Sequence, residues 1–195
     1  MIACRSLCSL RSKTRWLSPA EQDRSRKGNL MDAAGFKTPV EDRHFEDYVP
    51  GSVHEFGMIT VDEDGIVAFA RQFDPQLFHT DPEGARSTLY GGLIASGWHT
   101  ASLMMRECVR HYLPRAASLG SPGIDELRWA LPVRPGDTLT VRATVLRATR
   151  SRSKPDRGIV QALFEVLNQK RDVVMSVKGV NFILCRSPQP SEPGA

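Results

Sequence analysis

The sequence predicts an α+β fold in which a curved antiparallel sheet wraps around one long central helix. Two observations predict it: residues 93–112 are apolar with helical spacing, and the last third reads as long strands joined by short turns. The chain has 195 residues, which suits one domain with a sizeable core. A helix this apolar must be covered on most sides, and one sheet covers only part of it. We therefore expect a homodimer or a higher homo-oligomer.

Residues 51–61 are expected to form a strand, and a short amphipathic helix should follow. Thr60 and Glu63 are spaced as a capping box at its start. Apolar residues then recur at steps of three and four: Ile66, Phe69, Ala70 and Phe73. The pair Asp74-Pro75 should end this helix, because proline disfavours helical backbone at the residue before it.

The stretch FDPQLFHTDPEGA (73–85) places Asp74 and His79 five positions apart. On this reading both lie on the loop that leaves the helix, where catalytic groups are often held by a rigid scaffold. A plainer interpretation makes Asp74 a loop cap and His79 a partly buried histidine with a satisfied partner. Asp81 is expected to cap the DPEGA turn.

The central helix should lie within GGLIASGWHTASLMMRECVRHYL (91–113). One face is formed by residues that step by three or four: Leu93, Gly97, Ala101, Met104, Cys108 and Tyr112. Four more apolar residues widen that face well beyond one stripe: Ile94, Trp98, Leu103 and Met105. A helix apolar nearly all round is a buried helix, so Met104 and Met105 are expected to fill the core, and His99 to pack there or at an interface.

Four strand candidates follow in the last third of the chain. The first, GIDELRWALPV (123–133), precedes the turn RPGD, and residues 138–146 then alternate, with Leu139, Val141, Ala143 and Val145 on one face. Residues 147–158 read as a polar loop, and residues 158–168 and 173–184 as two strands joined by QKRD. That loop carries Arg150, Arg152, Lys154 and Arg157, which form either a solvated loop or a contact for the phosphate groups of a ligand.

The basic charge belongs to the start of the chain. The whole sequence has a net charge of +4, while residues 1–30 hold seven Lys or Arg and two acids, a net of +5. The rest is close to neutral, so we expect no nucleic-acid partner. Residues 1–44 are assigned to an N-terminal extension, either disordered or an over-extended gene start; the Ser and Arg content of its first residues also suits a transit peptide. Residues 45–186 form the domain, and residues 187–195 a disordered tail.

Cysteine use and hydropathy favour a reducing, cytoplasmic location without a membrane partner. Cys4 and Cys8 alone cannot complete a tetrahedral metal site, and Cys108 and Cys185 read as buried or incidental thiols. No disulfide framework is indicated. No apolar run approaches the roughly 20 residues that a membrane helix needs. We expect no metal and no cofactor.

Over roughly residues 45–185 the chain resembles the MaoC-like acyl dehydratases, the (R)-specific enoyl-CoA hydratase family of the hot-dog fold. Three ordered segments carry the resemblance: Asp74-x4-His79-x-Asp81-Pro82-x-x-Ala85 with Phe69 ahead of it, the glycine-bearing turn 91–97, and Pro132-Val133 followed by Pro135-Gly136-Asp137. The chain also departs from the family pattern. Phe73 replaces a glycine, the Asn-Pro inside the motif is replaced with the proline moved to Pro75, Ser96 replaces a histidine, and Met105 aligns with a serine of some members. We expect these changes to affect substrate choice and to leave the Asp-His dyad unchanged.

The resemblance implies an acyl-CoA hydratase/dehydratase that adds water reversibly to a 2-enoyl thioester of coenzyme A or an acyl carrier. Asp74 and His79 would hold the reacting water as the catalytic dyad. Gly97 would bind the thioester oxygen through its amide, and Ser96 would orient that donor or the acyl chain; helix packing and a plain cap are the competing interpretations of these two. Trp98 and Trp129 could narrow an acyl tunnel.

Two other functions fit the same fold. A hot-dog thioesterase would direct a carboxylate at the thioester carbonyl, and the Asp-x4-His spacing argues against it. A non-catalytic acyl-CoA-binding partner subunit would bind the thioester without turnover, an alternative that the altered motif leaves open.

Overall fold

The computed structural model describes residues 35–187. The predictions for Cys4, Cys8, the rest of the leader and nearly all of the C-terminal tail lie outside the described residues. No helix within 35–187 is long and apolar enough to cross a bilayer. In the same range, no three His, Cys, Asp or Glu side chains gather where they could hold a metal ion.

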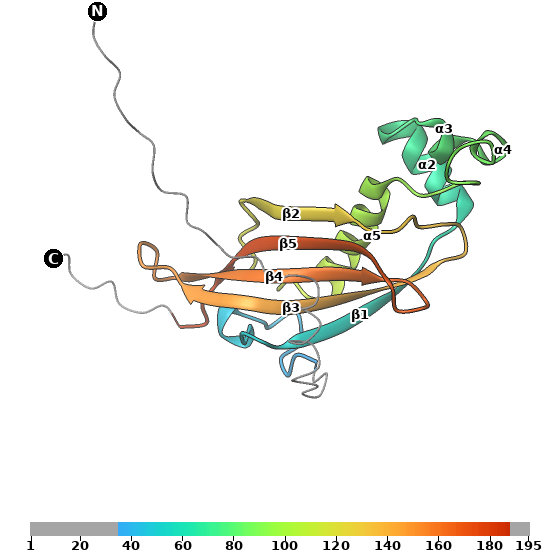
Figure 1. The fold of residues 1–195 in the computed structure, drawn as a ribbon. Helices are drawn as coiled ribbons and strands as arrows, with labels where there is room; N and C mark the ends of the chain where they lie inside the picture. The colour runs from blue at the N-terminus through green and yellow to red at the C-terminus, as the bar shows by residue number, and fades with distance from the viewer. Residues whose placement is uncertain (1–34, 188–195) are drawn as a thin grey trace, which may run out of the picture. The chain divides into compact units, whose positions relative to one another are not determined.

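Five antiparallel strands form one sheet with the order β1-β3-β4-β5-β2, which confirms the predicted fold class (Figure 1). Their bounds are β1 Val53–Thr60, β2 Gly123–Trp129, β3 Thr138–Arg150, β4 Arg157–Leu167 and β5 Val173–Leu184. Although β2 precedes β3 in the chain, it pairs with β5 at the opposite edge of the sheet from β1. The alternation predicted for β3 is confirmed, since Leu139, Val141, Ala143 and Val145 are all fully buried.

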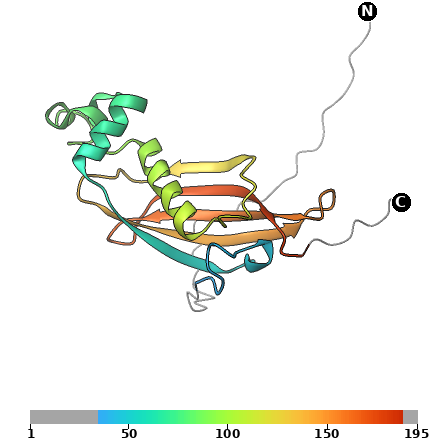
Figure 2. The same ribbon diagram turned by 180° about the vertical axis from the view of Figure 1, so that it is seen from behind.

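The polar loop predicted between β3 and β4 is shorter than the sequence suggested. β3 continues to Arg150 and β4 begins at Arg157, so the strands extend into the charged segment. Arg150 pairs with Glu46 at 2.9 Å and Arg157 with Asp156 at 2.8 Å. The loop lies at the opposite end of the sheet from α2, α3 and α4 (Figures 1 and 2). These contacts favour the interpretation of a solvated loop.

The long helix α5 (Gly97–His111) lies across one face of the sheet (Figure 2). Met104 and Cys108 are buried against the sheet, and Cys108 is a free thiol, as is the buried Cys185. The prediction of a helix buried all round is wrong for the single chain. Trp98, Met105 and Val109 are about half exposed, at 55%, 48% and 58%, because the sheet covers only one side of the helix.

The helix also begins later than its apolar pattern suggested. Leu93 and Ile94 are buried, but they precede α5 in an extended segment. The Ile94 amide donates to the Phe78 carbonyl at 3.1 Å, and the Ala95 amide donates to the Val133 carbonyl at 2.8 Å. Hydrogen bonds to distant segments therefore hold these residues out of the helix.

The short helix α2 (Glu63–Phe73) ends at Asp74 as predicted, but it does not start with the predicted capping box. Thr60 is the last residue of β1 and pairs with Thr138. Asp62 is the N-cap instead, and its carboxylate accepts from the Gly65 amide at 2.7 Å.

Two helical turns, α3 (Leu77–Thr80) and α4 (Pro82–Ala85), occupy the segment expected to be a loop. The Asp81 side chain accepts from the amides of Glu83 and Gly84, which confirms the predicted cap of the DPEGA turn. The segment from Asp74 to Ala85 is therefore held by its own backbone hydrogen bonds.

Residues 35–44, which the sequence assigned to the extension, lie against the domain ahead of the one-turn helix η1 (Phe45–Asp47). Phe36 stacks on His54 with ring centroids 3.7 Å apart, and the Arg43 guanidinium lies 3.5 Å from the centroid of Phe36. Arg43 also donates to the Tyr112 carbonyl at 2.8 Å. Residues ahead of the predicted boundary at residue 45 therefore pack on the domain.

Candidate active site

Asp74 is fixed at the point where α2 ends. Its amide donates to the Ala70 carbonyl at 2.9 Å, and Pro75 prevents the helix from continuing. The carboxylate is about one-fifth exposed. One oxygen, Oδ1, accepts from the side-chain amide of Gln76 at 2.8 Å, and the other, Oδ2, accepts from the Ser96 hydroxyl at 2.7 Å.

His79 lies on α3 and is buried, with 5% of its surface exposed. Its Nδ1 is 2.8 Å from the carbonyl oxygen of Ile94. A carbonyl oxygen can only accept, so Nδ1 carries a proton and donates it. In the neutral ring, Nε2 therefore presents a lone pair.

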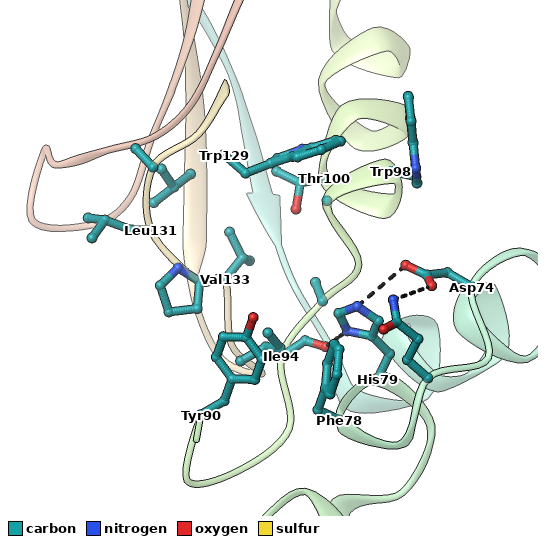
Figure 3. Close-up of a pocket in the computed structure, with 16 residues that line it drawn as sticks. Asp74, Phe78, His79, Tyr90, Ile94, Trp98, Thr100, Trp129, Leu131 and Val133 are labelled. Atoms are coloured by element: carbon teal, nitrogen blue, oxygen red, sulfur yellow. Dashed lines mark hydrogen bonds and ion pairs between the residues drawn. The ribbon is translucent and has the colours of Figure 1, made fainter. Parts of the chain in front are cut away.

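That lone pair faces Asp74. The distance between Nε2 of His79 and Oδ2 of Asp74 is 3.4 Å (Figure 3). If the imidazole is neutral and the carboxylate is ionised, two hydrogen-bond acceptors face each other at this distance, which is unfavourable. Either a proton on Nε2 or a water molecule donating to both atoms resolves that conflict. The structure thus brings the two sequence-predicted residues face to face.

The surroundings of Asp74 favour its ionised form. Burial alone would raise the pKa of this carboxyl, but the hydrogen bonds from Gln76 and Ser96, with the nearby His79, lower the pKa below its ordinary value. Asp74 therefore holds its negative charge firmly and is a poorer proton acceptor than an ordinary aspartate.

Ser96 contacts Asp74 rather than the pocket surface. It is fully buried and is the N-cap of α5, where its Oγ accepts from the Trp98 amide at 3.2 Å while donating to Asp74. The sequence left two interpretations of this serine open: a residue that orients the amide donor or the acyl chain, and a plain cap. The structure places it at the cap position, where its hydroxyl joins the start of α5 to Asp74.

Gly97 is the first residue of α5 and lines the pocket. Its amide has no acceptor among residues 35–187, as expected in the first turn of a helix. A Cβ at this position would collide with the indole ring of Trp129. The contact with Trp129 therefore explains the lack of a side chain by packing, the alternative that the sequence left open for Gly97.

The pocket has a volume of about 570 Å³ and is lined mostly by apolar residues, with polar groups at Asp74, Gln76 and His79. Trp98 and Trp129 both line it and meet edge to face with ring centroids 5.2 Å apart. Its other lining residues come from the motif segment, the approach to α5 and its first turn, the segment after β2, and the start of β5: Asp74, Gln76, Phe78, His79, Tyr90, Ile94, Ala95, Gly97, Thr100, Ala130, Leu131, Pro132, Val133 and Val174. His99 is not among them; it packs on Phe69 with centroids 4.8 Å apart.

Two pocket residues escaped the sequence analysis. Gln76 sits inside the motif, yet nothing in its spacing shows that it hydrogen-bonds Asp74. Tyr90 precedes the glycine pair 91–92, which was considered only as the entrance to the helix. A polar residue beside a glycine turn within the motif region is the signal that could have found Tyr90.

Comparisons with known proteins agree with this geometry. Residues 47–165 match the family described as MaoC like domain. The structure of a MaoC-like dehydratase from Rhodospirillum rubrum is 44% identical, covers 74% of this chain and 99% of that one, and superposes with a TM-score of 0.69. An (R)-hydratase from A. caviae involved in PHA biosynthesis is 25% identical, with 68% of this chain and 95% of that one covered and a TM-score of 0.57.

A curated relative is the uncharacterized protein YdeM of Bacillus subtilis. It is 28% identical over 125 residues, which are 64% of this chain and 87% of that protein. With the family match spanning most of the domain and the sheet wrapped on α5, the chain belongs to the MaoC-like domain family and has the hot-dog fold.

Proposed function

We propose that this chain is a hydratase/dehydratase that adds water reversibly to the double bond of a 2-enoyl thioester carried by coenzyme A or an acyl carrier. The observation that carries the proposal is the facing pair of acceptors, Asp74 Oδ2 and His79 Nε2, on the wall of a pocket lined mostly by apolar residues. The family match and the similarity to a MaoC-like dehydratase and an (R)-hydratase support it.

The reacting water is held by both residues. Two acceptors 3.4 Å apart can both be reached by one water at ordinary hydrogen-bond distance. The water donates one hydrogen to the carboxylate and the other to Nε2, so its lone pairs face the pocket. This orientation directs the water oxygen at the β-carbon of a thioester lying on the apolar wall.

His79 accepts the proton in the hydration direction. As the water oxygen bonds to the β-carbon, Nε2 takes a proton and the π electrons of the double bond move through the α-carbon onto the thioester oxygen. The imidazolium then returns its proton to the α-carbon, and the enolate electrons form that C–H bond. Hydrogen and hydroxyl are added to one face of the double bond, and dehydration is the reverse sequence.

Charge on the thioester oxygen is stabilised at the start of α5. The unpaired amide of Gly97 is the donor, and the positive end of the helix dipole lies at the same place. The hydrogen bonds from Gln76 and Ser96 stabilise the negative charge of the Asp74 carboxylate. The carboxylate therefore orients the water and stays ionised throughout the reaction.

The test is a hydration assay with trans-2-enoyl-CoAs of short and medium chain length, read by loss of the conjugated thioester absorbance. Asp74→Asn should lower kcat by about 10²- to 10⁴-fold, the contribution typical of a positioned acid–base group, with near-normal thermal unfolding. Asp64→Asn, which changes an exposed carboxylate on α2, is the matched control and should retain activity.

Each alternative function has its own result in this assay. Release of free coenzyme A would identify a thioesterase. Binding of acyl-CoA without turnover of any substrate would identify a non-catalytic subunit and overturn the proposal.

The chain is expected to act as a homodimer through α5 and the free edge of β2. Trp98, Met105 and Val109 form an exposed apolar stripe on α5, and Ile124 on β2 is 57% exposed. Within residues 35–187 β2 pairs only with β5, which leaves its other edge open to a second chain. Light scattering should show a dimer in the wild type and a monomer for Met105→Glu, whereas Met58→Glu on β1 should stay dimeric.

A further inference from the structure

Tyr90 lies near the dyad, with Phe78 packed between its ring and the ring of His79. Its ring packs on Phe78 with centroids 5.0 Å apart, and Phe78 meets His79 at 4.5 Å. The imidazole and the phenol are therefore separated by no more than the sum of these two distances. The Arg134 guanidinium donates to the Tyr90 carbonyl at 2.6 Å and fixes its backbone.

The turn that follows also determines where Tyr90 points. Gly91 and Gly92 have φ of 63° and 154°, a left-handed region that residues with side chains rarely adopt. This turn lets the chain reverse immediately after Tyr90 and enter the segment before α5. Figure 3 shows the Tyr90 side chain pointing into the pocket, on the side away from Asp74.

The Tyr90 hydroxyl has no hydrogen-bond partner among residues 35–187. Its neighbours on that side of the pocket are apolar: Ile94, Leu131 and Val133 (Figure 3). The Thr100 hydroxyl, also on the lining, is directed at the Ser96 carbonyl at 3.4 Å. Among the described residues that line the pocket away from the dyad and Gln76, the Tyr90 hydroxyl therefore has no hydrogen-bond partner. The same is true only of the indole N–H groups of the two tryptophans, which are about half exposed.

The charge of the lining restricts what Tyr90 can bind. Among the residues that the structure describes, no Lys or Arg lines the pocket, and Asp74 is negative. A carboxylate on the acyl chain would find no cation there and would be repelled by Asp74. A phenol, in contrast, can donate to or accept from an uncharged oxygen.

We propose that Tyr90 selects acyl chains that carry an uncharged oxygen, such as a hydroxyl, ether or keto group, a few carbons from the double bond. This inference rests on the proposed function, because it assumes that the pocket holds the acyl part of a thioester. A small number of placed polar groups in an apolar pocket typically fixes ligand orientation and specificity.

Binding of unreactive saturated thioesters tests the selection independently of turnover. Calorimetry would compare 5-hydroxypentanoyl-CoA with pentanoyl-CoA and 6-hydroxyhexanoyl-CoA with hexanoyl-CoA. We expect the wild type to bind at least one hydroxylated member about twofold to tenfold more tightly, the net contribution of one hydrogen bond from a partly buried hydroxyl. Tyr90→Phe should remove this difference and leave the affinity for the plain chain unchanged.

Tyr112→Phe is the matched control, because the Tyr112 hydroxyl is buried in the core and has no partner among the described residues. It should keep the preference. Equal binding of both members of each pair by the wild type would overturn the inference. So would equal weakening of both by Tyr90→Phe, which would place the phenol on the thioester or the pantetheine. A retained preference without hydration of any enoyl-CoA would refute the proposed function alone, and binding of no acyl-CoA would overturn both.

Discussion

Replacing Ser96 with alanine should weaken the fold and the dyad together. The hydroxyl caps α5 by accepting from the Trp98 amide and donates to Asp74 Oδ2 at 2.7 Å. Loss of an N-cap costs about 1 kcal/mol. Loss of a hydrogen bond to a charged group costs about 1.5–3 kcal/mol, which we reduce because the carboxylate is partly exposed and keeps its bond from Gln76. The free energy of unfolding should fall by about 2 kcal/mol, or roughly 4–8 °C in Tm.

The pH dependence of this loss separates the two contributions. Asp74 has a lowered pKa in the folded state, so it stabilises the fold above its ordinary pKa of 3.8, and this contribution is lost as pH falls through the folded value. The stability difference between wild type and Ser96→Ala should therefore be largest near neutral pH. Below the folded pKa it should shrink to the N-cap part alone.

Thermal unfolding from neutral pH to about pH 3, monitored by circular dichroism, measures both parts. Ser102→Ala is the control, because it removes an exposed hydroxyl bonded only to the Trp98 carbonyl of the same helix and should change stability by less than about 0.5 kcal/mol. A Ser96→Ala protein with wild-type stability, or with a loss that does not vary with pH, would refute this account.

Three further substitutions or reactions test the structure. Gly97→Ala should cost about 1–3 kcal/mol by overpacking against Trp129, and the loss should be smaller in a Trp129→Ala background; additive losses in a double-mutant cycle would contradict the contact. In urea unfolding, Asp62→Ala should lower the free energy of unfolding by about 1 kcal/mol and Thr60→Ala should lower it by less, because Asp62 is the N-cap of α2. A larger loss for Thr60→Ala would instead support the capping box predicted from the sequence. Burial raises the pKa of the Cys108 thiol to about 12, so peptide-level mass spectrometry should find it unalkylated in native protein at pH 8; rapid labelling would show that α5 opens readily.

The parts of the fold that local pattern determines were predictable. The alternation in β3 showed its buried face because a strand has a side-chain period of two, and Asp74-Pro75 marked the end of α2 because proline restricts the residue before it. The start of α5 was not predictable in this way. Leu93 and Ile94 match its apolar period, yet hydrogen bonding of the segment to the Phe78 and Val133 carbonyls draws them out of the helix.

The candidate site was likewise predictable only where a local motif identifies its residues. The motif identified Asp74 and His79, whose roles stay a prediction, and the structure brings their side chains together. The tautomer of His79 depends on the Ile94 carbonyl, which lies fifteen residues away and leaves no trace in the local pattern. The position of Tyr90 likewise depends on Phe78, which packs on its ring, and on Arg134, which donates to its carbonyl. Neither contact can be read from the local sequence.

Two of the four departures from the family pattern place a hydrogen-bond donor on Asp74, whereas we expected the departures to affect substrate choice alone. Ser96, in place of a histidine, donates to one carboxylate oxygen, and Gln76, within the altered stretch after Pro75, donates to the other. A carboxylate with two donors is stabilised as the anion, and each donor lowers its affinity for a proton. In the proposed mechanism these two donors separate the roles of the retained pair: Asp74 would orient the water, and the Nε2 lone pair of His79 would take its proton.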